Sequence, residues 1–248
     1  DLFVGDEKTQ TPEQFPIERK PPSTVLAMRQ IVHDTYHDAA ALARAGWPLR
    51  WSDDDAPSGW TIETDTTGHQ TTQRYVALGA PESWLRYRHL LPNEKVWHAI
   101  EHNRTPSLPE PQPKLVGDFN SYNTRITGHA MQYRKGWADP FQVPDEYQGI
   151  HWVGDLMVEA DLQVSKSQGD LVLEVVEAGH RFQTVIDLAT GEARCQVLPW
   201  ESDQAVAVGG TAKTALANQG KHSVLFANVD DQLLLWVDNK LVEFSEPT

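Results

Sequence analysis

Cysteine is almost absent from this chain of 248 residues, because Cys195 is the only one. A single cysteine excludes an intrachain disulfide and a zinc site built from several thiolates. Cys195 lies near Val197 on an alternating stretch, and we interpret it as a small buried hydrophobic residue. Basic residues never cluster beyond the pair Arg19-Lys20, and the formal net charge is −14. This balance argues against nucleic acid and anionic lipid as partners.

Long hydrophobic runs are also missing. No apolar stretch approaches the roughly 20 residues that a membrane-spanning helix needs, so we expect nothing in this chain to cross a membrane. The sequence begins at Asp1 with neither methionine nor a signal-peptide pattern, which predicts a processed chain or a fragment. Internal repeats, low-complexity tracts and a clear break in composition are absent as well.

Alternation of apolar and polar residues is the strongest pattern that the sequence contains. In residues 155–164, Leu156, Val158 and Leu162 share one face, while Glu159 and Asp161 share the other. Similar stretches separated by turn residues follow at 170–177, 180–188, 193–198, 223–228, 232–237 and 241–244. Consecutive short strands of this kind predict an all-β fold in which two antiparallel sheets pack face to face.

The N-terminal half is less regular. Prolines make residues 5–22 an extended arm, and a helix is predicted over 25–32. Alanines predict a second helix over 39–45, and a helical turn is expected within 94–102. Further strands are expected at 60–64, 74–78 and 84–90, at the outer and edge positions of the same sandwich. We therefore predict an arm with a short helix over 1–30 and a single sandwich domain over 31–248.

Two long phrases carry a family resemblance. I-D-L-A-T-G-E-A-R at 186–194 and F-A-N-V-D-D-Q-L-L-L-W-V-D at 226–238 resemble a segment of planctomycete signal-peptidase-like proteins. The similarity extends upstream through 19–30 and 84–91, so that it covers most of the chain. In that family a concanavalin-like jelly roll is inserted within the type I signal peptidase domain. The resemblance therefore implies a concanavalin-like jelly-roll β-sandwich, which would leave one sheet edge unpaired if a strand after Phe244 is missing.

The resemblance also implies where the chemistry lies. Signal peptidases use a serine nucleophile and a lysine base, and the family motifs S-M-x-P-T and K-R-x-x-G-x-P-G do not occur here. No catalytic residue can be carried over, so the serine and the lysine would lie before Asp1 and residues 1–4 would be the remnant of a peptidase strand. We expect a non-catalytic region on the extracytoplasmic side of the membrane, anchored by the rest of its parent. Its expected partner is a preprotein substrate or a carbohydrate.

A glycoside hydrolase or a lectin is the alternative. Concanavalin-like glucanases carry E-x-D-x-x-E or E-x-D-x-E on one strand, with a retaining pair of carboxylates about 5 Å apart. Glu159 and Asp161 match the first half, but Gln163 follows where an acid is needed. Trp152 could stack on a sugar ring beside them. Glu159, Asp161 and Trp152 are therefore the candidate glycan cleft.

No cofactor is expected. His33 and His37 have a zinc-ligand spacing if they lie on a helix, but a third ligand is missing. Calcium was weighed at residues 53–55 and at Asp230-Asp231, where aspartates are dense. Neither run has the alternating D-x-D-x-D-G pattern, so calcium at these residues stays only the alternative to the absence of a cofactor.

Overall fold

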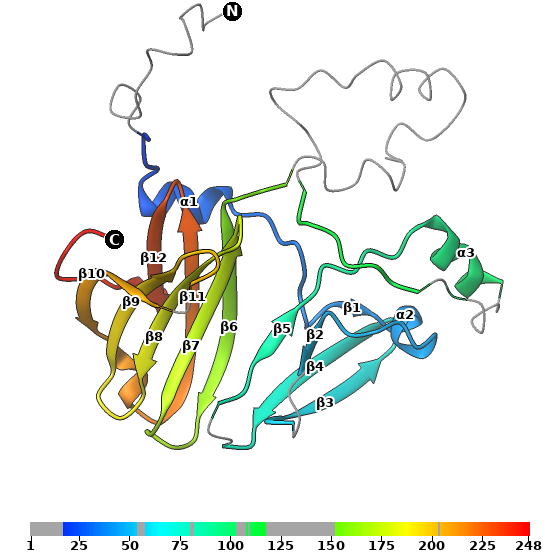
Figure 1. The fold of residues 1–248 in the computed structure, drawn as a ribbon. Coiled ribbons are helices and arrows are strands. Elements are labelled where there is room, and N and C mark those ends of the chain that lie inside the picture. The colour runs from blue at the N-terminus through cyan, green and yellow to red at the C-terminus, as the bar shows by residue number, and fades with distance from the viewer. Residues whose placement is uncertain are drawn as a thin grey trace, which may run out of the picture. The chain divides into compact units, whose positions relative to one another are not determined.

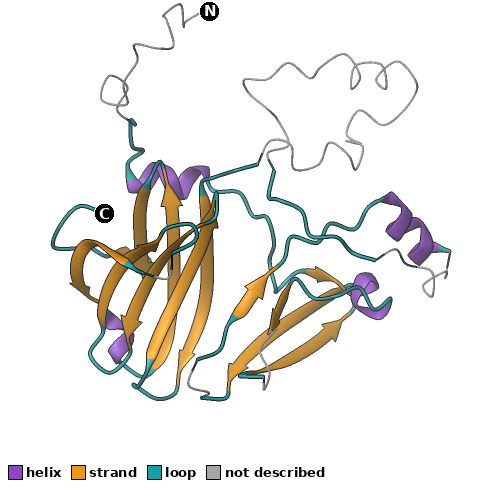
Figure 2. Ribbon diagram, in the orientation of Figure 1, coloured by secondary structure: helices purple, strands orange, loops and turns teal. Residues whose placement is uncertain are grey.

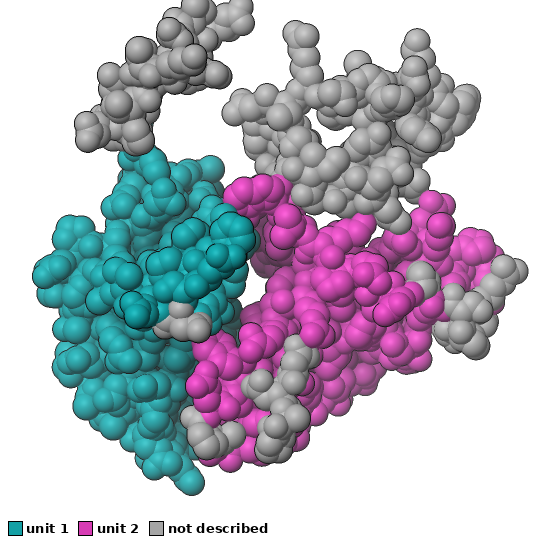
Figure 3. Space-filling model, viewed as in Figure 1, with its two compact units in different colours: residues 1–29, 154–248 teal, residues 30–153 magenta. Residues whose placement is uncertain are grey.

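The computed structural model describes residues 17–53, 58–79, 82–102, 108, 110–117, 152–202 and 204–248. The chain divides into two compact units (Figure 3). Unit 1 comprises residues 1–29 and 154–248, and unit 2 comprises residues 30–153. Unit 2 is therefore inserted, in sequence, between two parts of unit 1.

Unit 1 contains two four-stranded antiparallel sheets (Figures 1 and 2). One has the strand order β10-β9-β8-β7, and the other has the order β13-β12-β11-β6. The strands are β6 (Leu156–Val164), β7 (Asp170–Glu177), β8 (His180–Asp187), β9 (Glu192–Leu198), β10 (Val206–Lys213), β11 (Gly220–Val229), β12 (Gln232–Val237) and β13 (Lys240–Leu241). The helix α1 (Pro22–Met28) and the 3-10 turn η4 (Ala215–Ala217) complete the unit.

The two sheets of unit 1 share one hydrophobic core, which gives a sandwich-like arrangement. Ile186 of β8, Phe226 of β11 and Leu235 of β12 are fully buried in it. Leu156, Val158, Ala160, Leu162 and Val164 of β6 pack against the same core, so the predicted alternation of this strand is confirmed. Cys195 is also buried there, and burial raises the pKa of its thiol to about 11.

The outer face of the β6-β11-β12 sheet is buried as well, because α1 covers it. Val25 of α1 joins a second core cluster with Leu225, Ala227 and Val229 of β11 and with Leu234 and Trp236 of β12. Strands covered on both faces read as nearly continuous apolar runs, as 224–229 and 233–237 do. The hairpin β11-β12 therefore depends on a helix that lies far away in the sequence.

Charged residues on either side of α1 form ion pairs with the strands and turns of residues 154–248. Lys20 Nζ lies 2.5 Å from Asp230 Oδ1, and the backbone N–H of Lys20 donates to Asp230 Oδ2 at 3.1 Å. On the other side, Arg29 Nη1 lies 3.0 Å from Glu159 Oε2. The helix begins three residues earlier than predicted, since Pro22 takes the first helical position, where proline is favoured. It ends where Arg29 adopts an extended conformation, with φ −58° and ψ 140°.

β10 was not predicted, because its sequence is interrupted by two glycines. Gly209 and Gly210 both have positive φ, 78° and 69°, and form a bulge at which the register with β9 shifts. The C-terminal residues pack over this bulge, with Ser245 N donating to Thr211 O at 3.1 Å and Glu246 N donating to Gly209 O at 3.0 Å. A Cβ at Gly209 would lie 2.3 Å from Thr248 Cγ2, and the positive φ of this residue favours glycine.

Unit 2 has smaller sheets of its own (Figure 1). One has the order β1-β4-β3, and β2 pairs with β5. The elements are β1 (Asp38–Ala39), α2 (Ala40–Arg44), β2 (Trp51–Asp53), β3 (Trp60–Thr67), β4 (Gln70–Ala77), β5 (Leu85–Tyr87) and α3 (Glu94–Glu101). Trp47, Leu90 and Val96 form its buried core cluster.

The helices and strands expected in the N-terminal half are present, but their pairing differs from the expectation. The described strands β1 to β5 bond only with one another, so they do not extend the sheets of unit 1. The domain division at residue 30, with one sandwich over 31–248, stays a prediction. Residues 1–4 lie outside the described residues. Among the described residues no helix has the length and apolarity needed to cross a membrane.

Val25→Ala tests the contact between α1 and the sheet. Val25 is 3% exposed, so the free energy of unfolding should fall by about 1–3 kcal/mol in urea denaturation followed by circular dichroism. Met28→Ala, in the same helix but 61% exposed, is the control and should change it by less than about 0.5 kcal/mol. Equal effects of the two substitutions would contradict the packing of α1.

Candidate functional site

Glu159 and Asp161 lie together on the outer face of β6. Glu159 is exposed and forms its ion pair with Arg29 instead of facing a second carboxylate. Asp161 is exposed too and stands opposite Ser223 of β11 in the sheet register. Trp152 belongs to unit 2, where it is 50% exposed and forms an isolated bridge with Gly117. The glycan cleft predicted from these three residues stays a prediction.

The residues weighed as metal ligands have other partners. His33 and His37 do not share a helix face, because residues 31–37 form a loop with a turn. His37 Nδ1 lies 2.7 Å from Asp34 Oδ2, and Asp230 is held by Lys20. Asp53 Oδ2 accepts from the Ser58 hydroxyl, while residues 54–55 lie outside the described part of the chain. In the described ranges no cluster of three or more His, Cys, Asp or Glu residues could hold a metal ion.

A cavity of about 270 Å³ lies in unit 2 beside His33. Polar side chains from the 33–38 segment and from Arg50 line it together with aliphatic ones and Trp97. Its lining residues are Ile31, Val32, His33, Asp34, His37, Asp38, Ala39, Leu42, Arg50, Pro92 and Trp97. We call it the His33 cavity.

The imidazole of His33 is the most constrained polar group in this cavity. Its side chain is 5% exposed, and its ring stacks on Tyr87 of β5 with the centroids 5.7 Å apart. Nδ1 lies 3.6 Å from Asp38 Oδ1, which favours the tautomer protonated at Nδ1. Nε2 is buried and has no hydrogen-bond partner among the described residues. A buried acceptor without a partner costs free energy.

Asp38 is itself held in place by a chain of hydrogen bonds from β4. Gln73 Nε2 donates to Asp38 Oδ2 at 2.5 Å, and the Tyr75 hydroxyl donates to Gln73 Oε1 at 2.6 Å. Burial raises the pKa of Tyr75, so its hydroxyl stays a donor at neutral pH. These bonds fix the carboxylate on the Nδ1 side of His33.

The charge of Arg50 acts on the rings of His33, Tyr87 and His89. Burial lowers the pKa of His33; the nearby Arg50 lowers it further, whereas Asp38 opposes the shift. Burial and Arg50 also lower the pKa of His89, whose Nδ1 lies 3.0 Å from the Tyr87 hydroxyl. Both imidazoles are therefore mainly neutral at pH 7. Within the described residues Arg50 forms no ion pair with a carboxylate; its Nη1 lies 3.5 Å from Val32 O, and its side chain also hydrogen-bonds Tyr87.

The rim of the His33 cavity is apolar and exposed. Ile31 is 81% exposed, Val32 44% and Trp97 36%. Exposed aliphatic side chains beside a polar floor are typical of a ligand site, where they give contact area and the polar groups give orientation. His33 was singled out from the sequence only for its spacing to His37. Arg50 was missed, because nothing local in the sequence connects it to residue 33.

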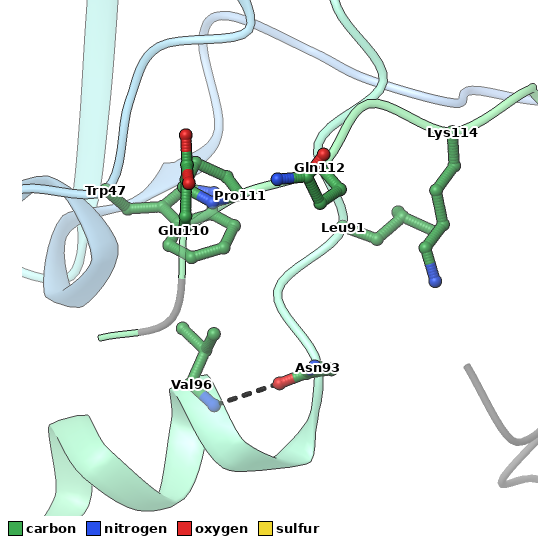
Figure 4. A pocket seen from close by; sticks show the side chains of 8 residues that line it. All are labelled: Trp47, Leu91, Asn93, Val96, Glu110, Pro111, Gln112 and Lys114. Carbon is green, nitrogen blue, oxygen red and sulfur yellow. Dashed lines mark hydrogen bonds between the residues drawn. The ribbon is translucent and has the colours of Figure 1, made fainter. Parts of the chain in front are cut away.

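A second cavity in unit 2, of about 260 Å³, lies beside Trp47 (Figure 4). Its lining comes from the beginning of α3, from the segment before that helix and from residues 110–114. The residues are Trp47, Leu91, Asn93, Val96, Glu110, Pro111, Gln112 and Lys114. We call it the Trp47 cavity.

No protein-family model matches the chain, and no match was found among curated proteins or solved structures.

The pKa of His33 is a direct test of this geometry. Arg50→Gln removes a neighbouring positive charge and should raise the pKa of His33, while Asp38→Asn removes a negative charge and should lower it further. Arg44→Gln, an exposed arginine of α2, should leave it unchanged. Histidine NMR titration measures all three variants, and shifts of the same sign in Arg50→Gln and Asp38→Asn would contradict the cluster.

Proposed function

We propose that this chain is a non-catalytic, extracytoplasmic region of a signal-peptidase-like membrane protein, and that it binds and positions a segment of preprotein. The fold proposed with it is a concanavalin-like jelly roll, of which the two antiparallel sheets of unit 1 are the coarser observation. The phrases at 186–194 and 226–238 and the absence of both catalytic motifs support the proposal. The parent's membrane anchor and its serine and lysine would lie outside residues 1–248.

The observation that carries the binding role is the cavity that places Arg50 beside exposed aliphatic side chains. Arg50 offers donors that no carboxylate of the described residues takes up. The C=O of a peptide group is a matching acceptor. A peptide segment could therefore bond to Arg50 while its side chains contact the aliphatic rim.

The rim favours a peptide over a sugar. Ile31 and Val32 are aliphatic and exposed, and they suit the apolar side chains of an extended polypeptide. A sugar ring would place hydroxyl groups against side chains that cannot hydrogen-bond them. Trp97 is the only aromatic side chain among the apolar residues that line the cavity. We therefore assign the cavity to a preprotein segment.

The hydrolase alternative receives little support from Glu159. Its carboxylate is exposed and paired with Arg29, whereas a general acid needs an environment that keeps it protonated. Glu177 is the carboxyl group of unit 1 with a raised pKa, caused first by burial and then by Asp231 and Asp155. Its Oε2 accepts from Asn228 Nδ2 at 2.7 Å at the end of the core, which gives it a structural partner.

Peptide binding is the first test. A fluorescein-labelled apolar pentapeptide amide should bind the full chain saturably in fluorescence anisotropy, and Arg50→Gln should weaken binding about tenfold or more, because a charged donor is lost. Arg44→Gln is the matched control and should bind like the unchanged protein. Absence of binding, or equal affinity of the two variants, would overturn the assignment. Saturable binding of an oligosaccharide at this cavity, or cleavage of the peptide by the chain, would contradict the proposed function.

Glu159→Gln tests the alternative separately. Because Glu159 forms a surface ion pair, the substitution should change the free energy of unfolding by less than about 1 kcal/mol and should leave any activity on oligosaccharides unchanged. A hydrolytic activity that is lost in Glu159→Gln would favour the hydrolase instead.

A further inference from the structure

We infer that the imidazole of His222 is a pH-dependent switch, whose protonation holds the C-terminal segment, residues 240–248, against the core of unit 1 and whose deprotonation loosens it. The contacts of the ring are the starting point. His222 Nδ1 lies 2.9 Å from Asp238 Oδ2, and Nε2 lies 3.0 Å from the backbone oxygen of Asn218. The side chain of His222 is 9% exposed, so water competes little for the contact with Asp238.

Both ring nitrogens of His222 therefore face acceptors. A carboxylate and a backbone carbonyl can only accept, whereas a neutral imidazole carries one N–H and leaves its other nitrogen an acceptor. The neutral ring would set two acceptors against each other at one of the two contacts, while the imidazolium, with two N–H groups, satisfies both. In agreement, the pKa of His222 is raised, first by its hydrogen bond to Asp238, although burial acts in the opposite direction.

The surroundings of His222 leave Asp238 as the charged group that controls its titration among the described residues. Lys221 of β11 and Asp161 of β6 are close in the sheet register. Alternation directs their side chains to the outer face, whereas His222 shares the inner face with its partner in the register, Leu162. The ring thus responds to one carboxylate.

Asp238 connects the ring to the C-terminal segment. It follows β12 in the turn that leads to β13, and its φ is positive, 51°. Its Oδ1 accepts from Ser223 N at 3.1 Å, and its own N–H donates to Ser223 O at 2.8 Å. The pKa of Asp238 is lowered, first by the hydrogen bond to His222 and also by Lys240, so the carboxylate stays ionised while His222 titrates.

The chain beyond this turn covers part of the core (red in Figure 1). Val242 N donates to Leu235 O at 2.8 Å, and Val242 and Phe244 pack against the core that both sheets share. β13 itself has only the two exposed residues Lys240–Leu241. A strand this short contributes little stability of its own, so we expect the segment to open more often when the turn before it loses the contact with His222.

The pH range follows from the two directions. Because the pKa of His222 is raised in the folded chain, its stabilisation is complete below about pH 6.5 and is lost as the pH rises through the raised value. Because the pKa of Asp238 is lowered, its stabilisation is complete above about pH 3.9 and is lost as the pH falls through the lowered value. The segment is therefore held best in mildly acidic solution. The switch does not rest on the proposed function, since His222 and Asp238 belong to unit 1 and do not line the His33 cavity.

Histidine NMR titration of the full chain is the first test. The pKa of His222 should lie above the ordinary value of about 6.5, and Asp238→Asn should lower it, because the ring loses its carboxylate. The His222 resonances are identified by their disappearance in His222→Gln. A pKa at or below the ordinary value in the unchanged protein would overturn the inference.

Amide hydrogen exchange tests the connection from the ring to the segment. Between pH 6 and pH 8.5 the protection factors of the Val242 and Ser245 amides, corrected for the intrinsic exchange rates, should fall about threefold or more. In His222→Gln they should be low at both pH values and differ less than twofold, and Asp238→Asn, a second variant should the first fail to fold, should behave alike. His69→Gln, at an exposed histidine of unit 2, is the matched control and should keep the pH dependence. Protection that does not change with pH in the unchanged protein, or that falls equally in both His222→Gln and Asp238→Asn, would refute the switch.

Discussion

The structure of unit 1 depends on covering both faces of the β11-β12 hairpin. The inner face packs in the core that both sheets share, and the outer face is covered by α1 through Val25. Because α1 precedes residue 30 and β6 begins at Leu156, the sheet and its cover come from opposite sides of unit 2 in the sequence. Lys20 and Arg29 add ion pairs to Asp230 and Glu159. The insertion is thus compatible with one continuous core, since both parts of unit 1 are needed to bury the hairpin.

Unit 2 also keeps polar groups in its interior. The hydrogen bonds from Tyr75 and Gln73 fix Asp38, Asp38 faces one nitrogen of His33, and the other nitrogen is left without a partner. Trp47 shows the same feature with opposite polarity, a buried donor in place of a buried acceptor. Both groups line cavities. Buried polar atoms cost free energy unless they are paired, and these two have no partner among the described residues.

Much of the fold was predictable from sequence, but the site was not. Period-2 alternation identified β6 to β9, because each has a buried face that the pattern records directly, and apolar runs bounded by turn residues identified the β11-β12 hairpin. β10 was not predicted from the sequence, because the two glycines of its bulge interrupt the alternation of apolar and polar residues. The outer cover of β11 and β12 could not be assigned to residue 25, since contacts between distant segments leave no periodic pattern. His33 could be noticed in the sequence from its spacing to His37. Its proximity to Arg50 and Tyr87 could not be predicted, for the same reason.

The coding sequence on both sides of residues 1–248 is the measurement that tests the proposed role most directly. The account predicts a membrane-spanning helix, S-M-x-P-T and the lysine box upstream, and the third signal-peptidase box, G-D-N-x-x-x-S-x-D-S-R, downstream. This chain would then be a binding region between the two halves of a peptidase. A reading frame that starts just before Asp1 and stops after Thr248, with none of these motifs, would contradict the account, and glycan binding by the sandwich would become the leading hypothesis.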